Sequence, residues 1–145
     1  MGFGEIASQV IFYIAVIVLA SSISAMLFVT VQKMSVEVSE QGEVFKKLIG
    51  TDFEIINDPV NVPYNSSINA YVFYIKNTGS EDLIFTNNTL TVLLNGSAVQ
   101  FTTSAHVLKP GETGTIYVYT SQLTGDNKLI VVSESGVKKS FEFTV

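Results

Sequence analysis

The sequence contains no cysteine, tryptophan or arginine, and its one histidine is His106. Without cysteine the chain can form no disulfide, no thiolate zinc site and no cysteine nucleophile. All eight basic residues are lysines, and the formal net charge is -5. Because binding to a phosphate backbone needs a clustered basic surface, this charge balance argues against a nucleic-acid partner.

Motifs that carry catalysis are also missing. The sequence has no Gly-rich phosphate loop, no Walker motif and no HExxH pair. Neither a cysteine partner nor a serine in a nucleophile elbow accompanies His106. Asp52, Glu54 and Asp58 form a loose acidic group, for which a solvated edge is a simpler interpretation than a calcium site. We therefore expect a non-enzymatic protein with no catalytic residue, no metal and no cofactor.

The longest hydrophobic run, residues 6–32, carries no formal charge over 27 residues. A helix needs roughly 20 apolar residues to cross the core of a bilayer, so the run predicts a transmembrane helix. A secretory signal fits less well, because no Lys or Arg precedes the run and its apolar part exceeds about 15 residues. Ala20-Ser21-Ser22 does resemble a cleavage site, but the apolar pattern continues beyond it. The predicted anchoring side chains are Ile11, Phe12, Ile14, Val16, Val18, Leu19, Ile23, Leu27 and Phe28.

One acidic residue, Glu5, stands directly before this run. A carboxylate there favours the positive end of the helix dipole, so Glu5 fits an interfacial residue at a helix N-terminus. The alternative is that Glu5 pairs with a cationic group on a neighbouring subunit.

After the run the apolar residues follow a different spacing. Intervals of three and four residues, typical of a coiled-coil seam, separate Val31, Met34, Val38, Gln41, Phe45 and Leu48. This stalk is predicted to pack either on a partner or on its own domain. We expect one helix from about residue 4 to about residue 48, ended by Gly50 and Thr51. The predicted domains are a transmembrane helix (1–32), a helical stalk (33–50) and a β domain (51–145).

From Thr51 onward, short β-branched and aromatic runs alternate with turn residues. Ala70–Lys76 and Thr115–Thr120 are typical of half-buried strands, and Asn95-Gly96 indicates a tight hairpin. Seven or eight such runs occur at spacings near ten residues, with no helix between them. They predict an α+β chain in which one long helix precedes an all-β, immunoglobulin-like sandwich of 7–8 antiparallel strands.

Candidate contact residues lie in these strands. An edge strand offers unpaired backbone groups to a partner. The candidate edges are the last strand, Val137–Val145, and the strand that holds Tyr117 and Tyr119. The predicted partner interface comprises Tyr71, Tyr117, Tyr119, Phe141 and Phe143. Three Asn-x-Ser/Thr sequons, predicted to lie in loops as candidate N-glycosylation sites, begin at Asn65, Asn87 and Asn95.

The distribution of lysines and the composition of the β domain give conflicting indications of the orientation in the membrane. Lys33, Lys46 and Lys47 follow the run and no Lys or Arg precedes it, which by the positive-inside rule would place the β domain inside the cell. The abundance of Tyr, Thr, Ser and Asn in the β domain and its sequons favour the outside. On that ground we expect an extracellular β domain.

Three phrases carry a resemblance over the whole chain: MGFGEIASQVIFYIAVIVLASSISA, TDFEIINDPVNVPY and AYVFYIKNTG. The layout resembles the archaellum stator proteins of archaea, the FlaG family first and the FlaF family second. This resemblance implies a helix in the cytoplasmic membrane and a sandwich in the space beneath the S-layer. It also implies a FlaF-like β-sandwich partner, a contact with the S-layer protein, and a role in holding the rotary motor still.

The same layout extends to archaellins and type IV pilin-like proteins, in which the apolar helices pack into a filament core and a Glu at the fifth position pairs between subunits. In those families a basic residue and a glycine precede the apolar run, whereas here Gly2 and Gly4 stand without Lys or Arg. A stator subunit is therefore favoured over a homo-oligomeric filament subunit. A cell-surface adhesion module is the third hypothesis, since KNTG and KPGE resemble phrases of immunoglobulin-like surface domains.

Overall fold

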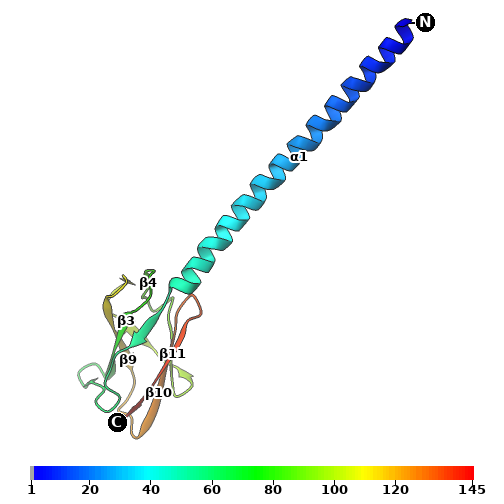
Figure 1. The fold of residues 1–145 in the computed structure, drawn as a ribbon. Coiled ribbons are helices and arrows are strands. Elements are labelled where there is room, and N and C mark those ends of the chain that lie inside the picture. Colours follow the sequence, from blue (N-terminus) through cyan, green and yellow to red (C-terminus); the bar gives the residue numbers. More distant parts are fainter. Residues whose placement is uncertain (1) are drawn as a thin grey trace. The chain divides into compact units, whose positions relative to one another are not determined.

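The computed structural model describes residues 2–145, and the chain divides into two compact units at Val44–Phe45. A single helix, α1, runs from Gly2 to Gly50 (Figure 1). No proline interrupts it, and residues that tolerate a helix occupy its length. The helix is continuous through residue 32, so the boundary expected there between span and stalk stays a prediction.

Two larger antiparallel sheets and a small one form the β region of the described chain. The first has the order β1-β3-β9-β7, with β2 also pairing with β3. Its strands are β1 (Phe53–Ile55), β2 (Tyr64–Asn65), β3 (Ala70–Asn77), β7 (Phe101–Thr103) and β9 (Thr113–Tyr119). The second has the order β11-β10-β5-β6. Its strands are β5 (Thr91–Leu94), β6 (Ser97–Ala98), β10 (Asp126–Val132) and β11 (Lys138–Thr144). A small third sheet pairs β4 (Leu83–Ile84) with β8 (Val107–Leu108).

The hydrophobic core lies between the two larger sheets. Alternate residues of each strand point inward, as in β3, where Phe73 and Ile75 are fully buried while Tyr74 is exposed. Facing them from the second sheet are Leu129 and Val131 of β10, which are also fully buried. The largest completely enclosed side chains are Phe53, Phe73, Phe85, Ile75, Ile116, Leu129, Val92, Val118, Val131 and Asn77.

The predicted fold class is therefore confirmed: one long apolar helix precedes an antiparallel β-sandwich. Seven strands of the described chain contain three residues or more, and four further strands contain two residues each. The expected hairpin is present, since Asn95 and Gly96 have φ angles of 52° and 84° and connect β5 to β6. Positive φ at both positions is the signature of a type I′ turn.

The end of α1 is bonded to the turn that follows β3, and we call this region, residues 46–52 and 78–81, the joint. The Gly50 carbonyl accepts the backbone N–H groups of Ser80 (2.8 Å) and Glu81 (3.2 Å). The Asp52 carbonyl accepts those of Thr78 (3.2 Å) and Gly79 (3.1 Å). A helix normally leaves its last carbonyls without partners, so the turn supplies donors that the helix lacks.

Asn77 supports the joint from inside the core. Its side chain is completely buried, and its Nδ2 donates to the carbonyls of Glu81 (2.9 Å) and Leu108 (2.8 Å). Its Oδ1 accepts the Gly79 N–H at 3.0 Å. A buried amide with all these partners fixes the turn and links it to β8.

Candidate membrane anchor and interaction surfaces

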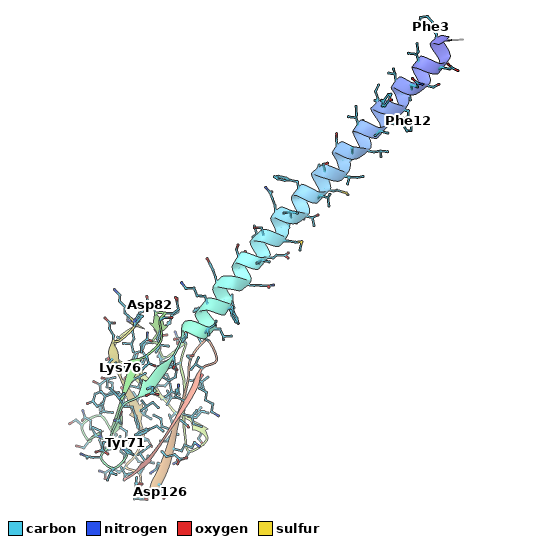
Figure 2. All side chains as sticks on the ribbon, in the orientation of Figure 1. Phe3, Phe12, Tyr71, Lys76, Asp82 and Asp126 are labelled. Carbon is cyan, nitrogen blue, oxygen red and sulfur yellow. The ribbon has the colours of Figure 1, made fainter. Side chains whose placement is uncertain are left out.

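Every predicted anchoring side chain lies exposed along α1, with exposed fractions from 45% at Val16 to 68% at Ile11. Figure 2 shows side chains projecting from the helix all round its axis, including Phe3 and Phe12. By length and composition α1 is able to cross a membrane, and it is the one such helix in residues 2–145. A helix that is apolar on all sides needs an apolar environment on all sides, which water does not provide.

The serine and threonine hydroxyl groups in the uncharged run are satisfied within the helix. Ser8, Ser21, Ser22, Ser24 and Thr30 each donate to the carbonyl four residues earlier, at 2.7–2.9 Å. These five are all the serines and threonines of residues 6–32. In a bilayer core no water is available to pair such groups, so this internal bonding makes the run compatible with hydrocarbon.

The acidic residues give no sign of a metal site. Over residues 2–145, no three His, Cys, Asp or Glu side chains come together in a metal-binding arrangement. Instead, Asp52 forms an ion pair with Lys139 at 3.0 Å, and the Asp58 carboxylate accepts the Val60 N–H at 3.0 Å. Glu5 lies exposed in the first turn of α1, and its pairing with another subunit stays a prediction.

Two of the five predicted interface residues are wrong, because Tyr71 and Phe143 are each only 2% exposed. The Tyr71 ring packs at a tilt against that of Tyr64 (4.7 Å between centroids), and its hydroxyl accepts the Leu123 N–H at 3.0 Å. Phe143 packs against Phe73, with 5.4 Å between ring centroids. These side chains are enclosed by their own fold and cannot contact a partner.

Phe141, also predicted at the interface, is half-buried beside the core. Its ring lies 6.3 Å from that of Phe73 and is stacked on that of Phe143 at 6.0 Å. Its main contacts are thus internal, which leaves little of the ring for a partner.

Tyr117 and Tyr119 lie on the outer face of the first sheet. The register places Tyr117 opposite Val72, and Tyr74 opposite Thr115, on that same face. Tyr74 and Tyr119 are each 39% exposed, while Tyr117 and Val72 are half-buried. We call these four residues, Val72, Tyr74, Tyr117 and Tyr119, the tyrosine face. Exposed tyrosines are enriched at protein interfaces because they combine apolar area with a hydrogen-bonding group.

The predicted edge strands are only partly right. β9, which holds Tyr117 and Tyr119, lies between β3 and β7 and is not an edge. The local sequence around those tyrosines does not reveal whether their strand is central, because the order of strands in a sheet depends on pairing with residues far away in the chain. β11 is an edge of the second sheet, but the Thr144 N–H donates to the Pro59 carbonyl (2.9 Å) and Lys139 pairs with Asp52. Its outer side is therefore fastened at both ends to the segment that contains β1.

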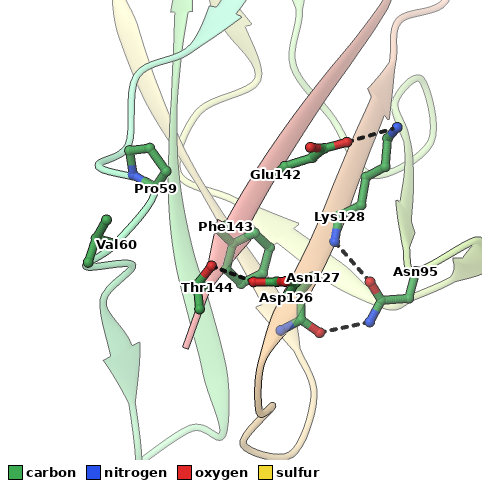
Figure 3. Close-up of a pocket in the computed structure, with 9 residues that line it drawn as sticks. All are labelled: Pro59, Val60, Asn95, Asp126, Asn127, Lys128, Glu142, Phe143 and Thr144. Carbon is green, nitrogen blue, oxygen red and sulfur yellow. Dashed lines mark hydrogen bonds and ion pairs between the residues drawn. The ribbon is translucent and has the colours of Figure 1, made fainter.

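A polar depression lies at the end of β10 and β11, where Pro59 and Val60 stand across from Thr144 (Figure 3). Its charged groups are already paired. Lys128 and Glu142 form an ion pair at 3.4 Å, and the Thr144 hydroxyl donates to Asp126 at 2.7 Å. Because these groups have partners within the chain, the depression is better explained as cross-strand pairing than as a ligand site.

The same depression contains Asn95 of the third sequon. The Asn95 Nδ2 donates to Asn127 Oδ1 at 2.8 Å, and Asn95 Oδ1 accepts the Lys128 N–H at 2.9 Å (Figure 3). The side chain thus joins the β5–β6 turn to β10. All three sequon asparagines are exposed, and Asn65 Oδ1 accepts the Ser67 N–H of its own sequon at 3.0 Å.

Comparison with known proteins gives consistent matches. A family model described as archaeal-type flagellin matches residues 2–143. Flagella-related protein G of Methanocaldococcus jannaschii is 34% identical over 139 residues, which are 91% of this chain and 90% of that protein. Its namesake from Methanococcus voltae is 27% identical over 144 residues, 94% and 95% of the two chains.

Among solved structures, the archaellum periplasmic stator protein FlaG of Sulfolobus acidocaldarius has a similar fold. The TM-score is 0.52 at 22% identity, and the match covers 64% of this chain and 99% of that one. This likeness concerns the fold.

Proposed function

Because the chain belongs to the archaeal-type flagellin family, we propose that it is a membrane-anchored structural subunit of the archaellum, and specifically a stator component. The family is one of structural proteins and not of enzymes. The observation that carries the proposal is the uncharged run of α1, whose serine and threonine hydroxyls are hydrogen-bonded within the helix and which precedes a compact sandwich.

In this proposal α1 stays in the cytoplasmic membrane and the sandwich stands outside the cell beneath the S-layer. Anchoring is supported by the length of the run, which exceeds the roughly 20 residues that a bilayer core requires. The outside location is supported by the exposed sequon asparagines Asn65 and Asn87. Contact with the S-layer protein follows from the resemblance to stator proteins and belongs to the same proposal.

For the partner, we propose a FlaF-like β-sandwich that binds the tyrosine face. Support comes from the exposed fractions of Tyr74 and Tyr119, and from the burial of the other predicted aromatic residues, which leaves this face as the accessible one. Tyrosine side chains at the centre of an interface often dominate its affinity. We expect Tyr74→Ser and Tyr119→Ser each to weaken binding at least about tenfold, measured as Kd with the full-length partner in detergent.

Val60→Ser is the matched control for that measurement. Val60 is 79% exposed and lies on the loop between β1 and β2, where it lines the depression beside Glu142 and Thr144. The control should leave Kd unchanged. Equal weakening by Val60→Ser and Tyr119→Ser would reject the tyrosine face as the specific contact.

A filament subunit is the second candidate, favoured by Glu5 in the first turn of α1 and by the flagellin name of the family. One experiment separates the two candidates. Filaments are sheared from native cells, and the protein is sought in the sheared filaments and in the washed membranes, with its N-terminus read by mass spectrometry. Recovery in membranes with residues 1–30 intact supports the stator. Recovery in filaments, or a cut near the start, supports the filament subunit.

A further inference from the structure

An exposed apolar stripe begins at the end of the uncharged run of α1 and continues beyond it, and we call it the stalk seam. Its apolar members are 51–66% exposed. Together with one glutamine, the seam consists of Val31, Met34, Val38, Gln41, Phe45 and Leu48. We propose that the stalk seam pairs, in parallel and in register, with the stalk seam of a second copy of this chain. The parallel arrangement of the two copies rests on the membrane anchoring proposed above.

The last turn of the seam faces away from the sandwich of its own chain. On the neighbouring side of the helix, Lys46 pairs with Glu81 at 3.2 Å and Lys47 lies 3.9 Å from Glu134. Phe45 and Leu48 remain 63% and 51% exposed. The alternative that this turn packs on its own domain is therefore removed, and its apolar surface is left for another molecule.

Gln41 indicates which residue of the partner helix lies opposite it. An amide has both donors and an acceptor, so two Gln41 side chains facing each other can pair. Against an apolar residue of an unrelated helix, Gln41 would lose its water without gaining a partner. A single polar residue in such a seam also sets the register of the two helices. Gln41 is thus satisfied by its own counterpart in a second copy.

The charges beside the seam allow two identical helices to meet. In a parallel pair, the residues that flank one seam face those that flank the other, and unlike partners are usually selected there by opposite charges. The flanking positions here are largely uncharged, and Glu37 falls opposite Gly42 of the second copy. No like charges are brought together across the seam. The remaining charges of the stalk, Lys33, Glu40, Glu43, Lys46 and Lys47, lie on the outer side of the helix.

The membrane span sets the direction and the relative level of the two helices. Two copies anchored by the same residues 6–32 emerge in the same direction and at the same height, so each seam residue meets its counterpart. The β-branched Val31 and Val38 occupy one set of core positions, and Leu48 belongs to the other. That combination favours two helices over three or four.

The absence of cysteine makes a direct test possible, because a single introduced cysteine is the only thiol. Val38→Cys and Met34→Cys place it in the seam, whereas Glu43→Cys places it on the outer side of the same helix. The full-length variants are oxidised in native membranes and separated on a non-reducing gel. Disulfides form only when the two Cβ atoms approach within reach, so we expect at least about five times more dimer from the seam variants.

Two outcomes overturn the pairing: equal dimer yields from Val38→Cys and Glu43→Cys, or no dimer from either seam variant. Cross-linking of the seam variants to a different protein overturns the second copy as the partner. Carbonate extraction of the same membranes tests anchoring separately. Extraction of the protein by carbonate refutes the anchor whatever the cross-links show. Retention without seam cross-links refutes only the pairing.

Discussion

Replacing Gly79 by alanine tests the joint between α1 and the sandwich. A Cβ at this position would lie 2.2 Å from the Gly50 carbonyl oxygen and 2.6 Å from the Asp52 nitrogen. Both neighbours are backbone atoms and cannot rotate away. Ordinary contact begins near 3.4 Å, so the two segments must separate by about 1 Å.

A shift of that size breaks the hydrogen bonds that hold the joint. The bonds from the N–H groups of Thr78 (3.2 Å) and Gly79 (3.1 Å) to Asp52, and from Glu81 to Gly50 (3.2 Å), would all exceed bonding distance. With the bond from Ser80 to Gly50 weakened as well, and each bond contributing about 1 kcal/mol, we expect the free energy of unfolding to fall by about 2–4 kcal/mol. For a domain of this size that corresponds to roughly 10–25 °C in Tm.

The measurement is thermal unfolding of the full chain in detergent, followed by near-UV circular dichroism of the tyrosines, all but one of which lie in the sandwich. Limited trypsin digestion gives a local readout, since Lys46 and Lys47 lie within the joint and should be cut faster when it loosens. Gly42→Ala is the control, because a Cβ at Gly42 meets nothing within 4 Å. A Tm for Gly79→Ala within about 2 °C of wild type, with unchanged digestion, would refute this account of the joint.

A core amide, an apolar side chain of α1 and the sequon asparagines can each be tested separately. Asn77→Ala removes the buried amide that donates to the carbonyls of Glu81 and Leu108. It should lower the free energy of unfolding by about 2–4 kcal/mol in urea titration, and a loss below about 1 kcal/mol would contradict this role of Asn77. Leu19→Lys puts a charge at the middle of the apolar run at a cost of about 3 kcal/mol, so less protein should resist carbonate extraction, whereas Leu19→Met should behave as wild type. In cells that carry out N-glycosylation, peptide mass mapping should show glycans at Asn65 or Asn87 and none at Asn95, whose amide nitrogen donates to Asn127. A glycan at Asn95 would show that this hydrogen bond does not protect the residue.

Much of the fold was predictable because local sequence determines it. The uncharged run has one compatible structure, and Asn95-Gly96 has the composition that a type I′ turn requires. The resemblance to archaellum proteins is confirmed by the family and by the relatives named flagella-related protein G. These features depend on residues close together in the chain.

The contact residues were less predictable because they depend on residues far apart. The alternation of β3 places Tyr71 with Phe73, but only the fold reveals that the Leu123 N–H, from the loop between β9 and β10, satisfies its hydroxyl. The central position of β9 follows from its pairing with β7, which no local pattern determines. The close approach of Gly50 and Gly79 is likewise invisible in the sequence, since each glycine alone is typical of a turn or a helix end.

The bonding at the joint has a mechanical consequence. A pull along α1 reaches β1 through the covalent chain and reaches the end of β3 through the two N–H groups bonded to the Gly50 carbonyl. β3 pairs with β1, β2 and β9, so the load spreads at once over most of the first sheet. Bonds loaded side by side must fail together, whereas bonds loaded in series open one after another. The turn at residues 78–81 therefore shares the force on α1 with β1, and this protects the short strand β1 from being pulled out of the sheet.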